Sequence, residues 1–180
     1  MSVSPRVLLL PGWFNSGPGH WQTLWEERHG YQRVQEHDWD RPLRGDWIMQ
    51  LEEAVLADAA PAVLVAHSLG SMQVAAWAAH STHTHRVRAA MLVAPGDVER
   101  QEIRAQLHSW SPIALAPLPF RSLLLASDND PYCTPERARH FAACWGSQRV
   151  DCGACGHINA ESGLGEWPKG HAWLQSLLND

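Results

Sequence analysis

Short apolar runs alternate along the chain with longer segments in which apolar residues recur every three or four positions. The short runs predict buried β-strands, whereas the recurrence is typical of helices that bury one face. Their alternation is typical of βαβ units, in which right-handed crossovers place helices on both faces of a parallel sheet. Strands are expected at residues 7–10, 62–66, 89–93 and 123–126, with a short last strand at 149–150. Residues 31–36 are expected to form a weaker, half-polar strand at an edge of the sheet.

The helical segments begin at recognisable capping signals. Asp46 is expected to cap the start of the second helix, and Thr134 followed by Pro135 opens another. Helices are expected over residues 20–29, from 46 through 55, and over 68–80, 98–107, 135–145 and 168–178. We therefore expect a single domain spanning residues 1–180, a compact three-layer α/β/α sandwich with a mostly parallel sheet of about six strands.

The junction at Ser68 is the most informative part of the sequence. The strand at 62–66 runs directly into the helix through Ala66, His67, Ser68, Leu69 and Gly70. A serine between a strand and a helix, with a small residue two positions before it and two positions after it, is typical of the nucleophile elbow. A bulky side chain at either of those positions would collide with the neighbouring strand or helix. The alternative interpretation is that Ser68 is an ordinary helix N-cap.

A serine nucleophile requires a carboxylate and a histidine that follow later strands, in that chain order. Asp128 and Asp130 lie in the loop after the strand at 123–126, and His157 lies in the glycine-rich loop after the last strand. We favour Asp130 as the acid because it lies deeper in its loop, and Asp128 stays open as the alternative. In such a triad, His157 accepts the Ser68 proton and Asp130 holds the other ring nitrogen.

Backbone N–H groups are expected to bind the oxyanion of the tetrahedral intermediate. One is the N–H of Leu69, at the start of the helix, where the helix dipole favours negative charge. The second is expected from the loop after the first strand, where Gly12 permits a tight turn and makes the Trp13 N–H the candidate.

The same loop supplies candidates for the substrate pocket. Phe14 and Asn15 are expected to wall an acyl pocket, and His20 and Trp21, at the head of the first helix, are expected to reach it. Trp110 lies in the proline-spaced segment 97–119 and is either a small cap over the site or an anchor of a surface loop. Five tryptophans at helical spacing are expected in the core: Trp21, Trp25, Trp47, Trp77 and Trp173.

Composition excludes several other chemistries. The 180 residues contain one lysine, Lys169, which fits neither a Walker phosphate loop nor a Ser-Lys dyad. The net charge of −5, without a basic cluster, argues against a nucleic-acid partner. The apolar run at 7–10 is too short for a signal sequence or a membrane span, and the four cysteines fit a reducing compartment, so a cytoplasmic location is expected.

Two groups of residues invite a metal or redox interpretation. His80, His83 and His85 lie at a helix end in Ser/Thr-rich sequence, where a solvated turn is the better interpretation. Cys152 and Cys155 have C-x-x-C spacing but neither open a helix nor have a complementary pair elsewhere. We therefore expect no metal and no cofactor.

Four motifs resemble one known family. They are P-G-W-x-N-S-x-x-x-H-W (residues 11–21), A-H-S-L-G (66–70), N-D-P-Y (129–132) and G-H-I-N-A-E-S-G-L-G-E-W-P-x-G (156–170). Together they resemble the small serine hydrolases of the retinoblastoma-binding protein 9 and YdeN type. The resemblance implies a compact α/β-hydrolase without a large lid, with Ser68, Asp130 and His157 as its triad, but it supplies no substrate.

The sequence thus predicts a serine hydrolase that cleaves a small carboxylic ester, thioester or amide through an acyl-enzyme on Ser68. Its partner is expected to be a small-molecule acyl substrate, with neither nucleic acid nor membrane involved, and the protein to be a monomer or a weak homo-oligomer. Two alternatives stay open. One is a binding module with weak turnover, and the other is acyl transfer or perhydrolysis on the same fold.

Overall fold

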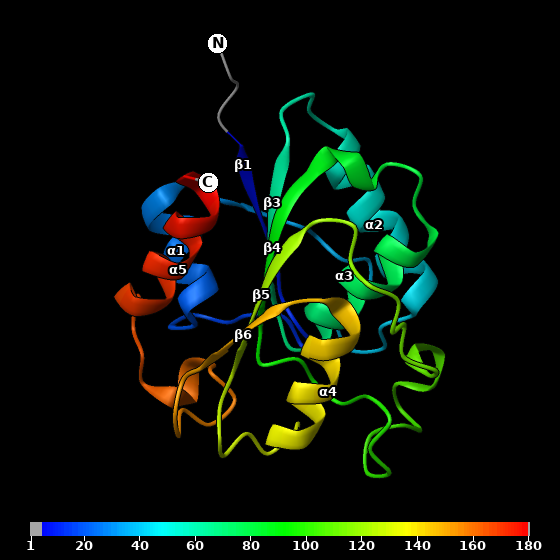
Figure 1. The fold of residues 1–180 in the computed structure, drawn as a ribbon, viewed down its shortest axis with the longest axis vertical. Helices are drawn as coiled ribbons and strands as arrows, with labels where there is room; N and C mark the ends of the chain where they lie inside the picture. The colour runs from blue at the N-terminus through cyan, green and yellow to red at the C-terminus, as the bar shows by residue number, and fades with distance from the viewer. Residues whose placement is uncertain (1–4, 180) are drawn as a thin grey trace.

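The computed structural model describes residues 5–179, and a six-stranded sheet forms its centre. All neighbouring strands are parallel, in the order β2-β1-β3-β4-β5-β6 (Figure 1). The strands are β1 (Arg6–Leu10), β2 (Gln32–Arg33), β3 (Ala62–His67), β4 (Val87–Val93), β5 (Arg121–Ala126) and β6 (Gln148–Asp151). The expected mostly parallel sheet is therefore confirmed, with every pairing parallel.

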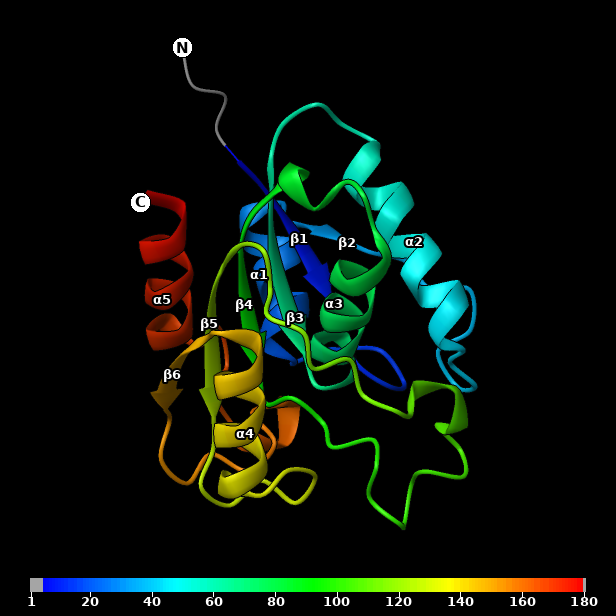
Figure 2. The same cartoon turned by 45° about the vertical axis from the view of Figure 1, so that its right-hand side comes forward.

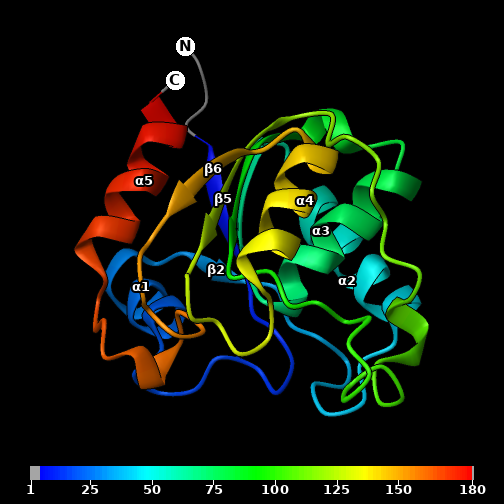
Figure 3. The same cartoon turned by 60° about the horizontal axis from the view of Figure 1, so that its bottom comes forward.

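Helices cover both faces of this sheet, which confirms the expected three layers. The helices are α1 (Trp21–His29), α2 (Arg44–Leu56), α3 (Leu69–His80), α4 (Pro135–Trp145) and α5 (Pro168–Asn179). Helices α1 and α5 pack on one face, and α2, α3 and α4 pack on the other (Figures 1 and 3). The chain moves outward from β1 to β2 and then returns to place β3 on the other side of β1. This reversal opens a crevice at the carboxyl ends of β1 and β3, where ligand sites of α/β folds form.

Alternate residues of the strands point to opposite faces of the sheet and belong to two separate apolar layers. Leu8 and Leu10 of β1 pack toward α2, α3 and α4, whereas Val7 and Leu9 pack toward α1 and α5. Four of the five tryptophans expected in the core are confirmed there, at 0–1% exposed, and Trp173 is partly buried against the α1 and α5 layer.

Three predicted elements differ from the structure. Strand β2 spans two residues, because only Gln32 and Arg33 pair with β1. Helix α2 begins at Arg44, so Asp46 lies in its first turn and is not its N-cap; the Ser109 hydroxyl accepts the Arg44 N–H at 3.0 Å and allows the earlier start. The prediction of a helix over residues 98–107 is wrong.

Residues 98–107 form a series of turns in place of that helix. Their backbone hydrogen bonds reach three residues back in some cases and four in others, as with Ile103 and Leu107, so no continuous helical ladder develops. Both carboxylate oxygens of Asp97, just before the segment, bind Arg137 of α4 at 2.9 and 3.1 Å. The Asp97–Arg137 ion pair therefore ties the start of this connection to α4. The connection runs beyond the carboxyl ends of the strands (Figure 2).

A buried carboxyl group connects β2 to the helical layer. Glu36 is 9% exposed and accepts a hydrogen bond at 2.6 Å from Gln73 of α3, which also donates to the Trp47 carbonyl at 2.8 Å. Glu36 Oε2 and Gln73 Oε1 have no partner among residues 5–179. Burial raises the pKa of Glu36 to about 8, so this group keeps its proton at neutral pH.

We expect Glu36→Gln to stabilise the protein increasingly as the pH rises from about 4.5 to 8. The unfolded chain releases the Glu36 proton near pH 4.5, whereas the folded chain holds it to about pH 8, so this group makes the wild type less stable across that window. The neutral amide has no such linkage, and the difference at pH 8 should be on the order of a few kcal/mol. Urea unfolding at pH 5, 6, 7 and 8 measures it. The exposed Glu53→Gln serves as the control; equal pH dependence in the wild type and Glu36→Gln would contradict the prediction.

Candidate active site

Ser68 occupies a strained turn between β3 and α3. Its backbone has φ 54° and ψ −118°, a conformation that L-residues rarely adopt, and its N–H donates to the Val93 carbonyl at 2.9 Å. The side chain makes no capping hydrogen bond to α3 in the described part of the chain. The geometry is therefore that of a strand-to-helix elbow and differs from an ordinary N-cap, which has extended backbone and a capping side chain.

Two glycines allow the chain to pack around this turn. A Cβ on Gly70 would lie 2.3 Å from the Leu10 carbonyl oxygen at the end of β1. A Cβ on Gly12 would lie 2.9 Å from the Ser68 Cβ and 3.3 Å from the Leu69 nitrogen. Only glycine fits at these positions, and the loop after β1 consequently lies directly against the elbow.

The structure brings Ser68, His157 and Asp130 together. His157 Nε2 lies 2.8 Å from Ser68 Oγ, and His157 Nδ1 lies 2.9 Å from each carboxylate oxygen of Asp130. The side chains of His157 and Asp130 are 9% and 3% exposed. Asp128, the alternative acid, is exposed to solvent, and its backbone N–H bonds to the Gly153 carbonyl.

Hydrogen bonds join the loop that carries Asp130 to the loop that carries His157. Asn129 Oδ1 accepts from the Gly156 N–H at 2.7 Å, and the Ser127 hydroxyl accepts from the Cys155 N–H at 2.8 Å. Ser127 in turn donates to Asn129 Oδ1 at 2.9 Å. These residues fix the separation of the two loops, a role that the sequence pattern did not predict.

A second histidine, His67, contacts the backbone of His157, a role that the sequence pattern did not predict. His67 is 5% exposed, and its Nε2 donates to the His157 carbonyl oxygen at 2.8 Å. Burial lowers the pKa of His67 well below its usual value, and the neighbouring His20 and His157 lower it further, so the ring is neutral. Its place next to Ser68 in the elbow motif was the available signal.

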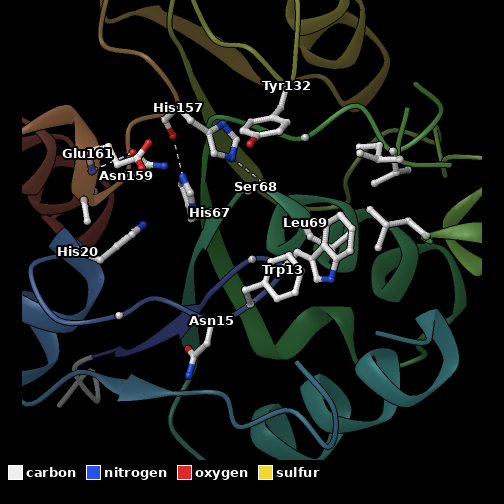
Figure 4. Close-up of a pocket in the computed structure, with 18 residues that line it drawn as sticks. Trp13, Asn15, His20, His67, Ser68, Leu69, Tyr132, His157, Asn159 and Glu161 are labelled. Atoms are coloured by element: carbon white, nitrogen blue, oxygen red, sulfur yellow. Dashed lines mark hydrogen bonds between the residues drawn. The ribbon is translucent and has the colours of Figure 1, made fainter. Parts of the chain in front are cut away.

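Ser68 opens into a cavity of about 480 Å³ at the carboxyl ends of the strands. Figure 4 shows the labelled side chains on two sides of Ser68, with His20, His67, Asn159 and Glu161 on one side and Trp13 and Leu69 on the other. Residues from the long β4–β5 connection also line it: Gly96, Val98, Ile103 and Leu107. Trp13, Leu69, Val98, Ile103 and Leu107 belong to one apolar cluster, which gives the cavity a polar side and an apolar side.

The predicted pocket residues divide between the cavity and the core. Phe14 lines the cavity, is 61% exposed and stacks on Trp13 at 4.6 Å. Asn15 also lines it, but its carboxamide points away from Ser68 and binds Arg33 (Figure 4). His20 reaches the cavity, whereas Trp21 is buried in the α1 layer, where its Nε1 donates to the Ile158 carbonyl.

Two aromatic residues needed the structure for their placement. Trp110 is 2% exposed, packs edge-on against Trp47 and donates to the Pro42 carbonyl at 3.0 Å, so it anchors its segment and does not cover the site. Tyr132 packs edge-on against the His157 ring with centroids 4.6 Å apart, and it is 45% exposed at the cavity. In the sequence, Tyr132 stands out only as the last residue of the N-D-P-Y motif.

Comparison with known proteins identifies the family. A family model described as serine hydrolase matches residues 7–176. The chain belongs to the serine hydrolase family. A solved structure from Pectobacterium atrosepticum, described as a YdeN-like hydrolase, is similar to this serine hydrolase, with 31% sequence identity and a TM-score of 0.87. The match covers 98% of this chain and 91% of the other, which confirms the resemblance to the YdeN type.

More distant structures show the fold alone. The ydeN gene product of B. subtilis has 18% identity and a TM-score of 0.79, with 98% of this chain and 100% of that one covered. Est1E from Butyrivibrio proteoclasticus, solved with ferulic acid bound, has 11% identity and a TM-score of 0.75, with 100% and 92% covered. The expected α/β-hydrolase fold is confirmed for this serine hydrolase. A search of curated proteins finds no match.

Other features of the described residues bear on the remaining interpretations. No group of three or more His, Cys, Asp or Glu side chains within residues 5–179 is arranged to hold a metal ion. In the histidine-rich turn, His83 binds Glu52 at 2.6 Å and His80 binds the Ala76 carbonyl at 2.8 Å. Among residues 5–179 of this serine hydrolase, no helix has the length and apolar character needed to cross a bilayer.

We expect Gly70→Ala to lower the free energy of unfolding by about 2–4 kcal/mol, because the new methyl group would collide with the Leu10 carbonyl. Gly45→Ala is the matched control. Gly45 is also the second residue of its helix, and a Cβ there meets nothing within 4 Å, so its stability should change by about 1 kcal/mol or less. Denaturant unfolding measures both, and equal effects would contradict the assigned close packing.

Proposed function

We propose that this protein hydrolyses small carboxylic esters, thioesters or amides through an acyl-enzyme on Ser68. The observation that carries the proposal is the continuous hydrogen-bonded series from Ser68 Oγ through His157 to Asp130, with contacts of 2.8 and 2.9 Å. The series opens into a cavity of suitable size for a small acyl substrate. Membership of the serine hydrolase family supports the same chemistry.

The reaction follows from the orientation of the three side chains. The Asp130 carboxylate accepts from Nδ1–H of His157, which leaves Nε2 as the acceptor for the Ser68 hydroxyl proton. Ser68 Oγ attacks the substrate carbonyl carbon while His157 Nε2 takes the proton. His157 then returns that proton to the departing alcohol, thiol or amine, and a water molecule activated in the same way releases the acid.

Two backbone amides are proposed to stabilise the oxyanion. Leu69 is the first residue of α3, so its N–H has no carbonyl within the helix to bond and lies at the positive end of the helix dipole. The Trp13 amide follows Gly12, whose close approach to Ser68 and Leu69 brings this loop to the same point. Each such donor contributes about 10²–10³ in rate in serine hydrolases of other folds.

A fluorophosphonate probe tests the nucleophile. The wild type is expected to label at one site, because Ser68 Oγ displaces fluoride from phosphorus, and Ser68→Ala is expected not to label. A p-nitrophenyl ester series of increasing acyl length then measures turnover. A wild type that does not label would show that the assigned nucleophile is wrong, whereas labelling without turnover on any ester would favour a binding module.

Asparagine variants of the two loop carboxylates test the acid. Asp130→Asn is expected to lower kcat by about 10³-fold or more, because the amide no longer holds His157 in the required tautomer. Asp128→Asn is the matched control from the same loop, and its exposed side chain predicts a change below about twofold. Esterase rates and probe-labelling rates should agree, and a larger loss in Asp128→Asn would reverse the assignment.

A further inference from the structure

His20 is an unusual residue in the cavity because it is both buried and incompletely hydrogen-bonded. It precedes α1 as the N-cap, and its Nδ1 accepts from the Gln22 N–H at 3.1 Å. The residue is 4% exposed, and Nε2 has no partner among residues 5–179. A buried polar atom without a partner costs about 1–3 kcal/mol, so an unpaired atom on a residue that lines the cavity suggests a binding group.

The tautomer of His20 follows from its contacts. Burial, then the nearby charge of Arg33, lower the pKa of His20 to about 3, so the ring is neutral at physiological pH. Since Nδ1 accepts a hydrogen bond, the single proton of the neutral ring lies on Nε2. The unpaired atom is therefore an N–H donor, and His20 offers the cavity neither a positive charge nor a base.

The surroundings of this donor define what it can bind. His20 lies against His67 with ring centroids 4.7 Å apart, and its ring extends toward His67, Asn159 and Glu161 (Figure 4). Asn159 Oδ1 accepts from the Glu161 N–H at 3.1 Å, which leaves the Asn159 amide group as a second donor on this side. The Glu161 carboxylate also lines the cavity and would repel an anion.

We infer that the His20 Nε2–H is a substrate-binding donor, which selects acyl substrates carrying a neutral oxygen acceptor on the polar side of the cavity. The acceptor is an ether, hydroxyl or carbonyl oxygen that is separate from the carbonyl under attack. The substrate group on the opposite side of the reacting carbonyl is then apolar, because it lies on the side of the cavity that contains Trp13 and Leu69. This inference rests on the proposed acyl-enzyme chemistry at Ser68 and defines the substrate class more narrowly.

Two pairs of esters, each differing only by oxygen in place of one methylene, test the inference. The acyl pair is p-nitrophenyl 3-methoxypropanoate and p-nitrophenyl pentanoate. The leaving-group pair is 2-methoxyethyl butanoate and butyl butanoate. The kcat/KM of each ester is divided by its own hydroxide-catalysed rate, which removes intrinsic reactivity. The wild type is expected to prefer the oxygen-containing ester by about 5–10-fold in one pair, as one neutral hydrogen bond provides, and that pair identifies which substrate group lies beside His20.

Two variants separate the donor from the capping role of His20. His20→Asn keeps a capping oxygen for the Gln22 N–H but removes the donor at Nε2, so the preference should fall to about twofold or less. His20→Gln keeps an N–H donor near that point and should retain part of the preference despite a weaker cap. His37→Asn, at an exposed histidine, is the control and should behave as the wild type.

The outcomes distinguish failure of this inference from failure of the proposed function. If the wild type labels with a fluorophosphonate and hydrolyses these esters, but its corrected ratios equal those of His20→Asn in both pairs, the donor does not contact substrate and the inference is wrong. If the wild type does not label, the proposed chemistry at Ser68 is wrong and the inference falls with it. If the role of His20 is purely structural, His20→Asn would lower the melting temperature and would lower kcat/KM equally for both esters of each pair. That result would contradict the inference.

Discussion

The left-handed backbone at Ser68 is the constraint on which the rest of the site depends. Its φ of 54° is one that L-residues rarely adopt, and the conformation persists because three segments close around it. The Ser68 N–H is held by the end of β4, Gly70 lies against the end of β1, and Gly12 lies against the Ser68 side chain. The strain is therefore balanced by packing between parallel strands, which is available only where β1, β3 and β4 end together.

Neutral histidines around His157 give the site its electrostatic character. The His67 ring packs against the His157 ring with centroids 4.8 Å apart, and the His20 ring packs against the His67 ring with centroids 4.7 Å apart. Burial is the largest cause of the lowered pKa of both rings, so neither contributes positive charge at neutral pH. If both were charged, they would oppose the imidazolium that the proposed mechanism forms at His157. The Asp130 carboxylate, 3% exposed and 2.9 Å from His157 Nδ1, would stabilise that imidazolium.

The sequence predicted those parts of the molecule that depend on local pattern. Apolar runs located the four central strands β1, β3, β4 and β5, and the strand–Ser68–helix order located the elbow. Strand lengths and the conformation of the segment after β4 depend on tertiary contacts, so the local sequence pattern could not predict them. The turns at 98–107 carry helical periodicity, yet their apolar side chains Val98, Ile103 and Leu107 face a cavity that only the assembled sheet creates. Likewise, nothing in the pattern could show that Asn129 joins two loops that are 27 positions apart along the chain.

The topology of the sheet explains why one cavity can have two chemically different sides. The crevice lies where the chain reverses direction in the sheet, so its walls come from opposite helical layers. The loop before α1 contributes His20 from one layer, whereas Leu69 and the β4–β5 connection contribute apolar side chains from the other. Ser68 lies at the boundary, because β3 is the strand beside which the reversal occurs. Under the proposed function, a substrate whose reacting carbonyl lies at Ser68 would extend one group toward each layer. The difference between the two layers would then set which group enters which side of the cavity.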